Sequence, residues 1–123
     1  MSTASEQAVE RFLLLRGWQL LHQNYRCPAG EIDLIFQHQQ EIIFIEVKYR
    51  ARPDFGDPAT HLSSQQLHRI QRAALHYLND QAALEHLQLR FDFIAAEPAQ
   101  GAIARKQLIA FEAYWFDWLE YCV

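Results

Sequence analysis

The chain has 123 residues, half of them hydrophobic, and a formal net charge of −4 at pH 7. This length fits one domain over residues 1–123, and the acidic balance argues against a general DNA coat protein, which would be basic. No stretch is long and apolar enough to span a membrane, and residues 1–6 lack a signal-peptide pattern, so we expect a cytoplasmic protein. The two cysteines match neither a disulfide framework nor a zinc motif.

The first half of the chain has the pattern of a helix followed by three strands. Apolar residues recur at helical spacing between residues 6 and 16, and Thr3 with Glu6 matches a capping box at the start of this helix. Gly17 is expected to end it. The three strands are expected over residues 18–25, 31–37 and 41–49.

The second half begins with a segment at residues 52–61 whose prolines and glycine indicate a surface loop. Ser63 is expected to begin a helix that has Ile70, Ala74 and Tyr77 on its apolar face. Strands follow over residues 89–95 and 103–109, and a last helix carries one seam of Phe111, Tyr114, Trp115, Trp118 and Cys122. The order α-β-β-β-α-β-β-α indicates an α/β domain with a mixed β-sheet flanked by helices.

Four charged residues stand inside two of the apolar strands. Carboxylates in such positions are costly to bury unless something pairs with them. If Gln39 and Gln40 form the tip of a hairpin, Asp33 faces Glu46 and Glu31 faces Lys48, all on one side of the sheet. The apolar residues between them are expected on the other, core-facing side: Ile32, Leu34, Ile45 and Val47.

Asp33 and Glu46 would then have Cβ atoms about 4.5–5.5 Å apart. Two carboxylates this close repel each other, and a divalent cation such as Mg²⁺ or Mn²⁺ would relieve the repulsion. Lys48 would hold or deprotonate a water molecule, or stabilise charge on a phosphate. The competing interpretation is a solvent-facing side of a sheet with ordinary pairs between acidic residues and lysine.

The motifs at residues 30–35 (GEIDLI) and 43–50 (IFIEVKYR) resemble those of the bacterial YraN family. More broadly, they are similar to the Asp…Glu-x-Lys core of the restriction-endonuclease-like superfamily and to the archaeal Holliday-junction resolvases within it. Shorter matches extend the likeness over most of the chain: Gly17-Trp18, Asn24-Tyr25-Arg26, Phe55-Gly56 and Arg90-Phe91-Asp92. The resemblance implies a restriction-endonuclease-like mixed sheet and hydrolysis of phosphodiesters that depends on Mg²⁺ or Mn²⁺.

The resemblance also implies roles for single residues. Asp33 and Glu46 would be metal ligands, together with the Val47 carbonyl, and Lys48 would be the catalytic lysine. Glu6 aligns with a glutamate that completes the metal site in related resolvases, whereas its alternative role is the capping box with Thr3. Glu31 would support the site or pair with Lys48.

One position departs from the family pattern. Gln66 stands where related sequences usually carry a lysine that contacts the active site or a phosphate. Glutamine donates hydrogen bonds but brings no charge. Ser63 and Gln66 also match a capping box, which gives this residue a structural alternative.

The expected partner is nucleic acid, DNA rather than RNA, with no membrane partner. Arg50 and Arg52 follow the second motif, and Arg69 and Arg72 lie on the second helix, where they would contact phosphates or form a solvated face. We expect Arg90 and Asp92 to form a buried structural pair. Two alternatives to a nuclease remain: a nucleic-acid-binding module without catalysis, and an interaction protein or homodimer that uses the seam of Tyr114, Trp115 and Trp118.

Overall fold

The structure is a computed structural model that describes residues 2–50, 63–99 and 109–122. The loop expected at residues 52–61, with Arg52, lies outside the described residues, as does nearly all of the strand expected over residues 103–109. Neither α-helix in the described part of the chain has the length and apolarity to cross a membrane.

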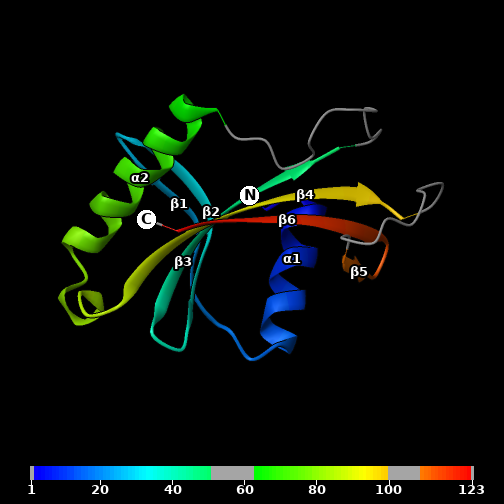
Figure 1. Ribbon diagram of the computed structural model, residues 1–123, viewed down its shortest axis with the longest axis horizontal. Helices are drawn as coiled ribbons and strands as arrows, with labels where there is room; N and C mark the ends of the chain where they lie inside the picture. The colour runs from blue at the N-terminus through cyan, green and yellow to red at the C-terminus, as the bar shows by residue number, and fades with distance from the viewer. Residues whose placement is uncertain (1, 51–62, 100–108, 123) are drawn as a thin grey trace.

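A six-stranded sheet runs through the molecule with one α-helix against each face (Figure 1). Its strand order is β1-β2-β3-β4-β6-β5; β3 and β4 are parallel, and the other neighbours are antiparallel. The mixed α/β sheet flanked by helices is therefore confirmed. The elements are α1 (Ala4–Leu15), β1 (Gln19–Cys27), β2 (Gly30–His38), β3 (Glu41–Tyr49), α2 (Ser64–Asn79), a 3₁₀ turn (Ala82–Leu84), β4 (Gln88–Pro98), β5 (Ile109–Phe111) and β6 (Tyr114–Cys122).

Alternation along β3 builds two cores, one on each side of the sheet. Ile43 and Ile45 pack in a cluster with Val9 and Leu13 of α1. The residues between them face the other way: Ile42 and Phe44 pack with Ile70, Ala73, Ala74 and Tyr77 of α2. Both faces of the central strand are thus buried, which explains its nearly continuous apolar run.

The helix ends follow the expected capping signals. The Thr3 side chain accepts a hydrogen bond from the Glu6 N–H at the start of α1, and Gly17 adopts a φ of +85° just after its end. Ser63 and Gln66 form both halves of the capping box that begins α2. These contacts satisfy backbone groups that the helix itself leaves unpaired.

The prediction of a helix at the end of the chain is wrong, because Tyr114–Cys122 is strand β6. Glu112, with a φ of 53°, sits in the two-residue turn that joins β5 to β6. Aromatic residues favour strands, and the same spacing is compatible with a period of two as well as with a helical seam. Tyr114 and Trp118 pack on the α1 side, whereas Trp115 points to the opposite face, so the expected single seam does not form.

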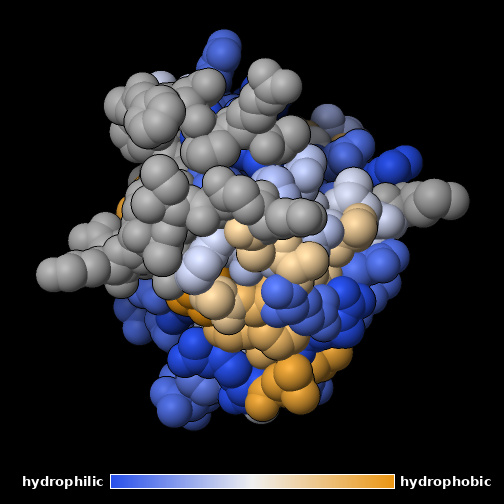
Figure 2. All heavy atoms as spheres, turned by 90° about the vertical axis from the view of Figure 1, so that its right-hand side faces the viewer, coloured by the Kyte–Doolittle hydropathy of each residue, from blue (hydrophilic) through white to orange (hydrophobic). Residues whose placement is uncertain are grey.

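The α1 side of the core reaches the surface near β5. Phe12 of α1 makes edge-to-face ring contacts with Phe111 and Phe116, at centroid distances of 5.2 Å and 5.7 Å. Leu14 and Leu15 at the end of α1 are exposed. Figure 2 faces the right-hand side of Figure 1 and shows hydrophobic residues gathered in the middle and lower part of the view, bordered by hydrophilic ones.

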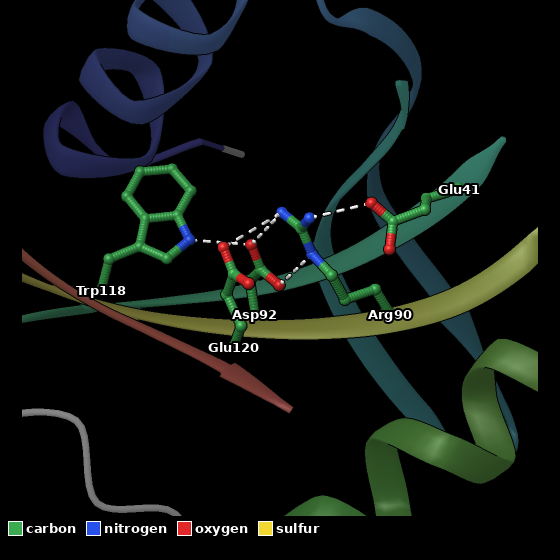
Figure 3. A network of polar contacts seen from close by, with 5 residues as sticks. All are labelled: Glu41, Arg90, Asp92, Trp118 and Glu120. Atoms are coloured by element: carbon green, nitrogen blue, oxygen red, sulfur yellow. Dashed lines mark hydrogen bonds and ion pairs between the residues drawn. The ribbon is translucent and has the colours of Figure 1, made fainter. Parts of the chain in front are cut away.

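A buried ion network joins β3, β4 and β6 on the α1 side (Figure 3). Arg90 donates two hydrogen bonds of 2.9 Å to Asp92 and one of 3.0 Å to Glu41. The Trp118 indole N–H donates to Asp92 at 2.7 Å, and the Arg90 guanidinium lies 5.2 Å from the Trp18 ring centre. The expected buried pair of Arg90 and Asp92 is therefore confirmed.

Candidate functional site

Asp33 and Glu46 come together where β2 and β3 cease to pair. The β2–β3 hairpin has the expected register, with paired positions from His38–Glu41 to Leu34–Ile45. Beyond this point, the Asp33 carboxylate accepts a hydrogen bond of 2.8 Å from the Val47 N–H. Its side chain also shares a hydrogen bond with Glu46. The predicted meeting of Asp33 with Glu46 is thus confirmed.

Two details of the predicted facing arrangement are wrong. Glu31 makes its ion pair with Arg26 of β1, at 3.6 Å, and not with Lys48. Ile32 packs in the α2-side cluster, whereas Leu34 packs in the α1-side cluster, so strict alternation fails around Asp33. The reason is that the β2–β3 ladder ends at Leu34, while β2 continues to pair with β1 as far as Gly30.

Burial is the main cause that raises the pKa values of both acids. The pKa of Glu46 rises to about 9, first because of burial and then because of the negative charge of Asp33 and their hydrogen bond. Burial also raises the pKa of Asp33, although hydrogen bonds from Val47 and Glu46 oppose the shift. At neutral pH the pair therefore keeps a proton on Glu46, which donates it to the Asp33 carboxylate.

Glu6 brings a third carboxylate to this region from α1. Burial and then the charge of Asp33 raise its pKa, and Glu6 in turn raises the pKa of Glu46. Contacts with Thr3 lower the pKa of Glu6, which supports the capping role. However, Glu6 Oε2 is buried and has no hydrogen-bond partner among the described residues. The cap therefore leaves one carboxylate oxygen available.

A pocket of about 350 Å³ opens beside Glu46, between the start of β2 and the first turns of α2. Two glutamates and one arginine are among the residues of its wall. Gly30 and Ile70 were not among the predicted site residues; a glycine directly before the acidic motif is the only signal in the sequence for the first of them. The lining residues are Gly30, Glu31, Glu46, Gln66, Arg69 and Ile70.

The predicted cations lie on β3, directly after it, and on α2. Lys48 is exposed on β3, two residues beyond Glu46 and on the same side of the strand. Arg50 follows β3, and its backbone N–H donates to the Ala96 carbonyl at 2.8 Å. Arg69 and Arg72 are exposed on α2.

The donor set fits a hard divalent cation. Asp33 and Glu46 supply the one or two carboxylates with which Mg²⁺ is usually bound, and the free Glu6 oxygen adds a third donor of the same type. In the described part of the chain, no three His, Cys, Asp or Glu side chains already converge as a preformed metal cluster. The hydrogen bond between the Asp33 and Glu46 side chains holds the two carboxyl groups together.

The sequence of the chain matches a known protein family. The model of the family described as "Uncharacterised protein family UPF0102" matches residues 5–96. The chain belongs to this family. UPF0102 is the YraN family that the two motifs indicated. The match runs from α1 to β4 and includes Glu6, Asp33, Glu46 and Lys48.

Curated UPF0102 proteins from several bacteria are similar to this chain over most of its length. The protein of Aeromonas hydrophila subsp. hydrophila is 43% identical over 96 residues, which cover 77% of this chain and 74% of the relative. That of Saccharophagus degradans is 38% identical over 98 residues, which cover 80% and 83%. A UPF0102 protein of Shewanella baltica is 41% identical over 98 residues, which cover 78% and 87%.

The shared proton makes a prediction about stability. We expect Glu46→Gln to stabilise the metal-free protein at pH 8 by on the order of 1–3 kcal/mol, because the glutamine amide donates to Asp33 without binding a proton. In the wild type, the pKa of Glu46 is 4.5 in the unfolded chain and is raised to about 9 in the folded protein. The stabilisation that the protonated Glu46 gives to the fold is therefore complete below pH 4.5 and is lost as the pH rises toward 9.

Urea unfolding in EDTA at pH 5.5 and pH 8 measures this effect. The wild type should be less stable at pH 8 than at pH 5.5, and Glu46→Gln should flatten the difference. Glu31→Gln is the control: Glu31 is exposed and paired with Arg26, and its charge is the smallest of the causes that raise the pKa of Glu46, so this variant should keep most of the pH dependence. A pH dependence that is identical in the wild type and Glu46→Gln would contradict the shared proton.

Proposed function

We propose that this UPF0102 protein is a divalent-metal-dependent nuclease that hydrolyses phosphodiester bonds in DNA. The observation that carries the proposal is the hydrogen-bonded pair of half-buried carboxyl groups, Asp33 and Glu46, with Glu46 on the wall of a pocket. Ordinary structural acids pair with bases, whereas this pair has a third carboxylate, that of Glu6, as its neighbour. Perturbed carboxylates beside a pocket are typical of functional sites.

In this proposal, Asp33 and Glu46 hold Mg²⁺ or Mn²⁺, with Glu6 as an additional ligand. When bound, the cation lowers the pKa of water and neutralises charge on a phosphoryl oxygen. The hydrogen bond from the Val47 N–H holds the Asp33 carboxylate in place. Lys48, on the same side of β3 as Glu46, orients the attacking water or stabilises negative charge on the phosphate.

Cleavage of DNA tests the proposal directly. Purified protein with Mn²⁺ or Mg²⁺ should cut single-stranded or branched DNA, and EDTA should stop the reaction. Lys48→Ala should lower kcat by about 100-fold or more, because it removes the cation beside the reacting phosphate. Arg16→Ala, a change on the far end of α1, should leave kcat unchanged. Absence of cleavage on every DNA structure tried would contradict the proposal.

The second candidate is a non-catalytic nucleic-acid-binding module. It is favoured by the engagement of Gln66 in the capping box of α2, where Gln66 Oε1 accepts from the Ser63 N–H at 3.0 Å. The pocket thus has a neutral amide where related sequences carry a lysine. DNA binding that depends on salt and is unchanged by Mn²⁺ would support this candidate over the nuclease.

A further inference from the structure

Arg69 is a cation on the wall of the carboxylate pocket that has no ionic partner among the described residues. It lines the pocket together with Glu31 and Glu46. Arg69 forms no ion pair with another residue of the described ranges, unlike Arg11, Arg26 and Arg90. A guanidinium presents a planar fork of N–H donors that matches a phosphate. Arg69 therefore offers this fork to a ligand in the pocket.

The packing of α2 fixes Arg69 at this position. Ile70, the next residue, is 6% exposed and packs in the α2-side cluster with Ile32. Gly30 begins β2 directly under the helix: a Cβ atom built on it would lie 3.9 Å from the Arg69 carbonyl oxygen. Because Ile70 sets the rotation of the helix and Gly30 lies against its backbone, Arg69 stands at the rim of the pocket.

The same arginine borders a second hollow, of about 560 Å³, on the outer side of α2. Arg72 and His68 line this hollow as well. Arg72 follows Arg69 by three residues, so the two side chains lie on one helix face about 4.5 Å apart along the axis. Arg69 lines both hollows, so its side of α2 lies next to the pocket that contains Glu46 as well as to the hollow that contains Arg72.

We infer that Arg69 binds a backbone phosphate of a nucleic-acid strand at the carboxylate pocket, and that Arg72 binds the next phosphate along α2. This inference rests on the proposed function and adds to it the path of the strand. Arg69 supplies the positive charge that Gln66 lacks, on the wall that faces Glu31 and Glu46. Phosphate contacts carry no base information, so binding along this path is independent of sequence.

A salt titration of binding tests the path. Binding of a fluorescein-labelled single-stranded oligonucleotide is measured in EDTA, in the Glu46→Gln background, which prevents cleavage. Arg69→Gln and Arg72→Gln should each weaken binding about five-fold and reduce the log–log salt slope by about 0.7, the value for one phosphate on a single strand. Arg69→Lys should keep the slope, because it keeps the charge.

The matched control is Arg16→Gln, which removes an exposed arginine at the end of α1. Thermal melting of all variants should stay within about a degree of the background protein. Equal losses from the α1 and α2 variants, or no loss from the α2 variants, would overturn the inference. DNA cleavage with Mn²⁺ is assayed in parallel with protein that retains Glu46. If this protein cleaves DNA but Arg69→Gln binds DNA as tightly as the background protein, the strand path is overturned and the nuclease proposal stands. If the protein neither binds nor cleaves DNA, both proposals are overturned.

Discussion

Asp33→Asn is expected to reduce metal-dependent DNA cleavage at least about 1,000-fold while the protein remains folded. The asparagine carbonyl oxygen can still accept the Val47 N–H that Asp33 binds at 2.8 Å, so the end of the β2–β3 hairpin keeps its hydrogen bond. The substitution removes the negative charge and replaces one of the two carboxylate oxygens by an NH₂ group, with little change in the size of the side chain. Single-turnover cleavage with Mn²⁺ in excess gives the loss as a rate, separate from any change in DNA affinity.

Asp33→Glu and Glu31→Gln complete this experiment. Asp33→Glu keeps the charge but lengthens the side chain, so it should retain a small residual rate. Glu31→Gln changes an exposed carboxylate of the same pocket that pairs with Arg26, and it should cost less than about ten-fold. Cleavage by Asp33→Asn at the wild-type rate would show that the nuclease activity resides elsewhere.

Asp92→Ala is expected to destabilise the fold by about 3–5 kcal/mol, because it leaves Arg90 buried without its main partner. The Asp92 side chain is fully buried and accepts two hydrogen bonds from Arg90 and one from the Trp118 indole (Figure 3). Glu41 remains at 3.0 Å and offsets only part of the loss. Urea unfolding followed by tryptophan fluorescence measures the change.

Glu120→Gln is the matched control in the same network. Its carboxylate lies 3.7 Å from Arg90, and its side chain is 55% exposed. An ion pair so open to solvent contributes little, so this variant should stay within about 0.5 kcal/mol of the wild type. Similar small effects from Asp92→Ala and Glu120→Gln would show that the network does not stabilise β3, β4 and β6.

The central hairpin was predictable because its signals are local. The alternation of apolar residues and a two-residue tip at Gln39-Gln40 fixed the register, and the meeting of Asp33 and Glu46 followed from it. The partner of Glu31 was not predictable in the same way. This partner is Arg26 of β1, and a strand with two neighbouring strands can pair its charged residues with either of them.

The last strand was not predicted because the spacing of its aromatic residues is compatible both with the two-residue period of a strand and with the roughly 3.6-residue period of a helix. A run that contains Tyr114, Phe116 and Trp118 alternates as a strand does, but a helical seam can be drawn through Tyr114 and Trp118 as well. The pairing with β4 that decides between them joins segments distant in sequence. The place of Arg69 on the pocket wall likewise depends on how α2 packs over Gly30, which no local pattern indicates.

Glu6 shows why a capping signal and a metal ligand are hard to separate in a sequence. A glutamate in the first turn of a helix fits both roles. The Thr3–Glu6 contact was expected from the capping pattern, but only the fold reveals that Glu6 also has a buried oxygen with no hydrogen-bond partner among the described residues. A carboxylate can therefore satisfy the capping pattern and remain available to a cation.

Calorimetric titration with Mn²⁺ tests the central claim most directly, since it asks whether Asp33 and Glu46 hold a divalent cation. The wild type at pH 7.5 should show one saturable site and release a proton, because binding displaces the proton that the raised pKa keeps on Glu46. Asp33→Asn should show no saturable heat. The absence of a site in the wild type, or an identical isotherm for Asp33→Asn, would contradict the account.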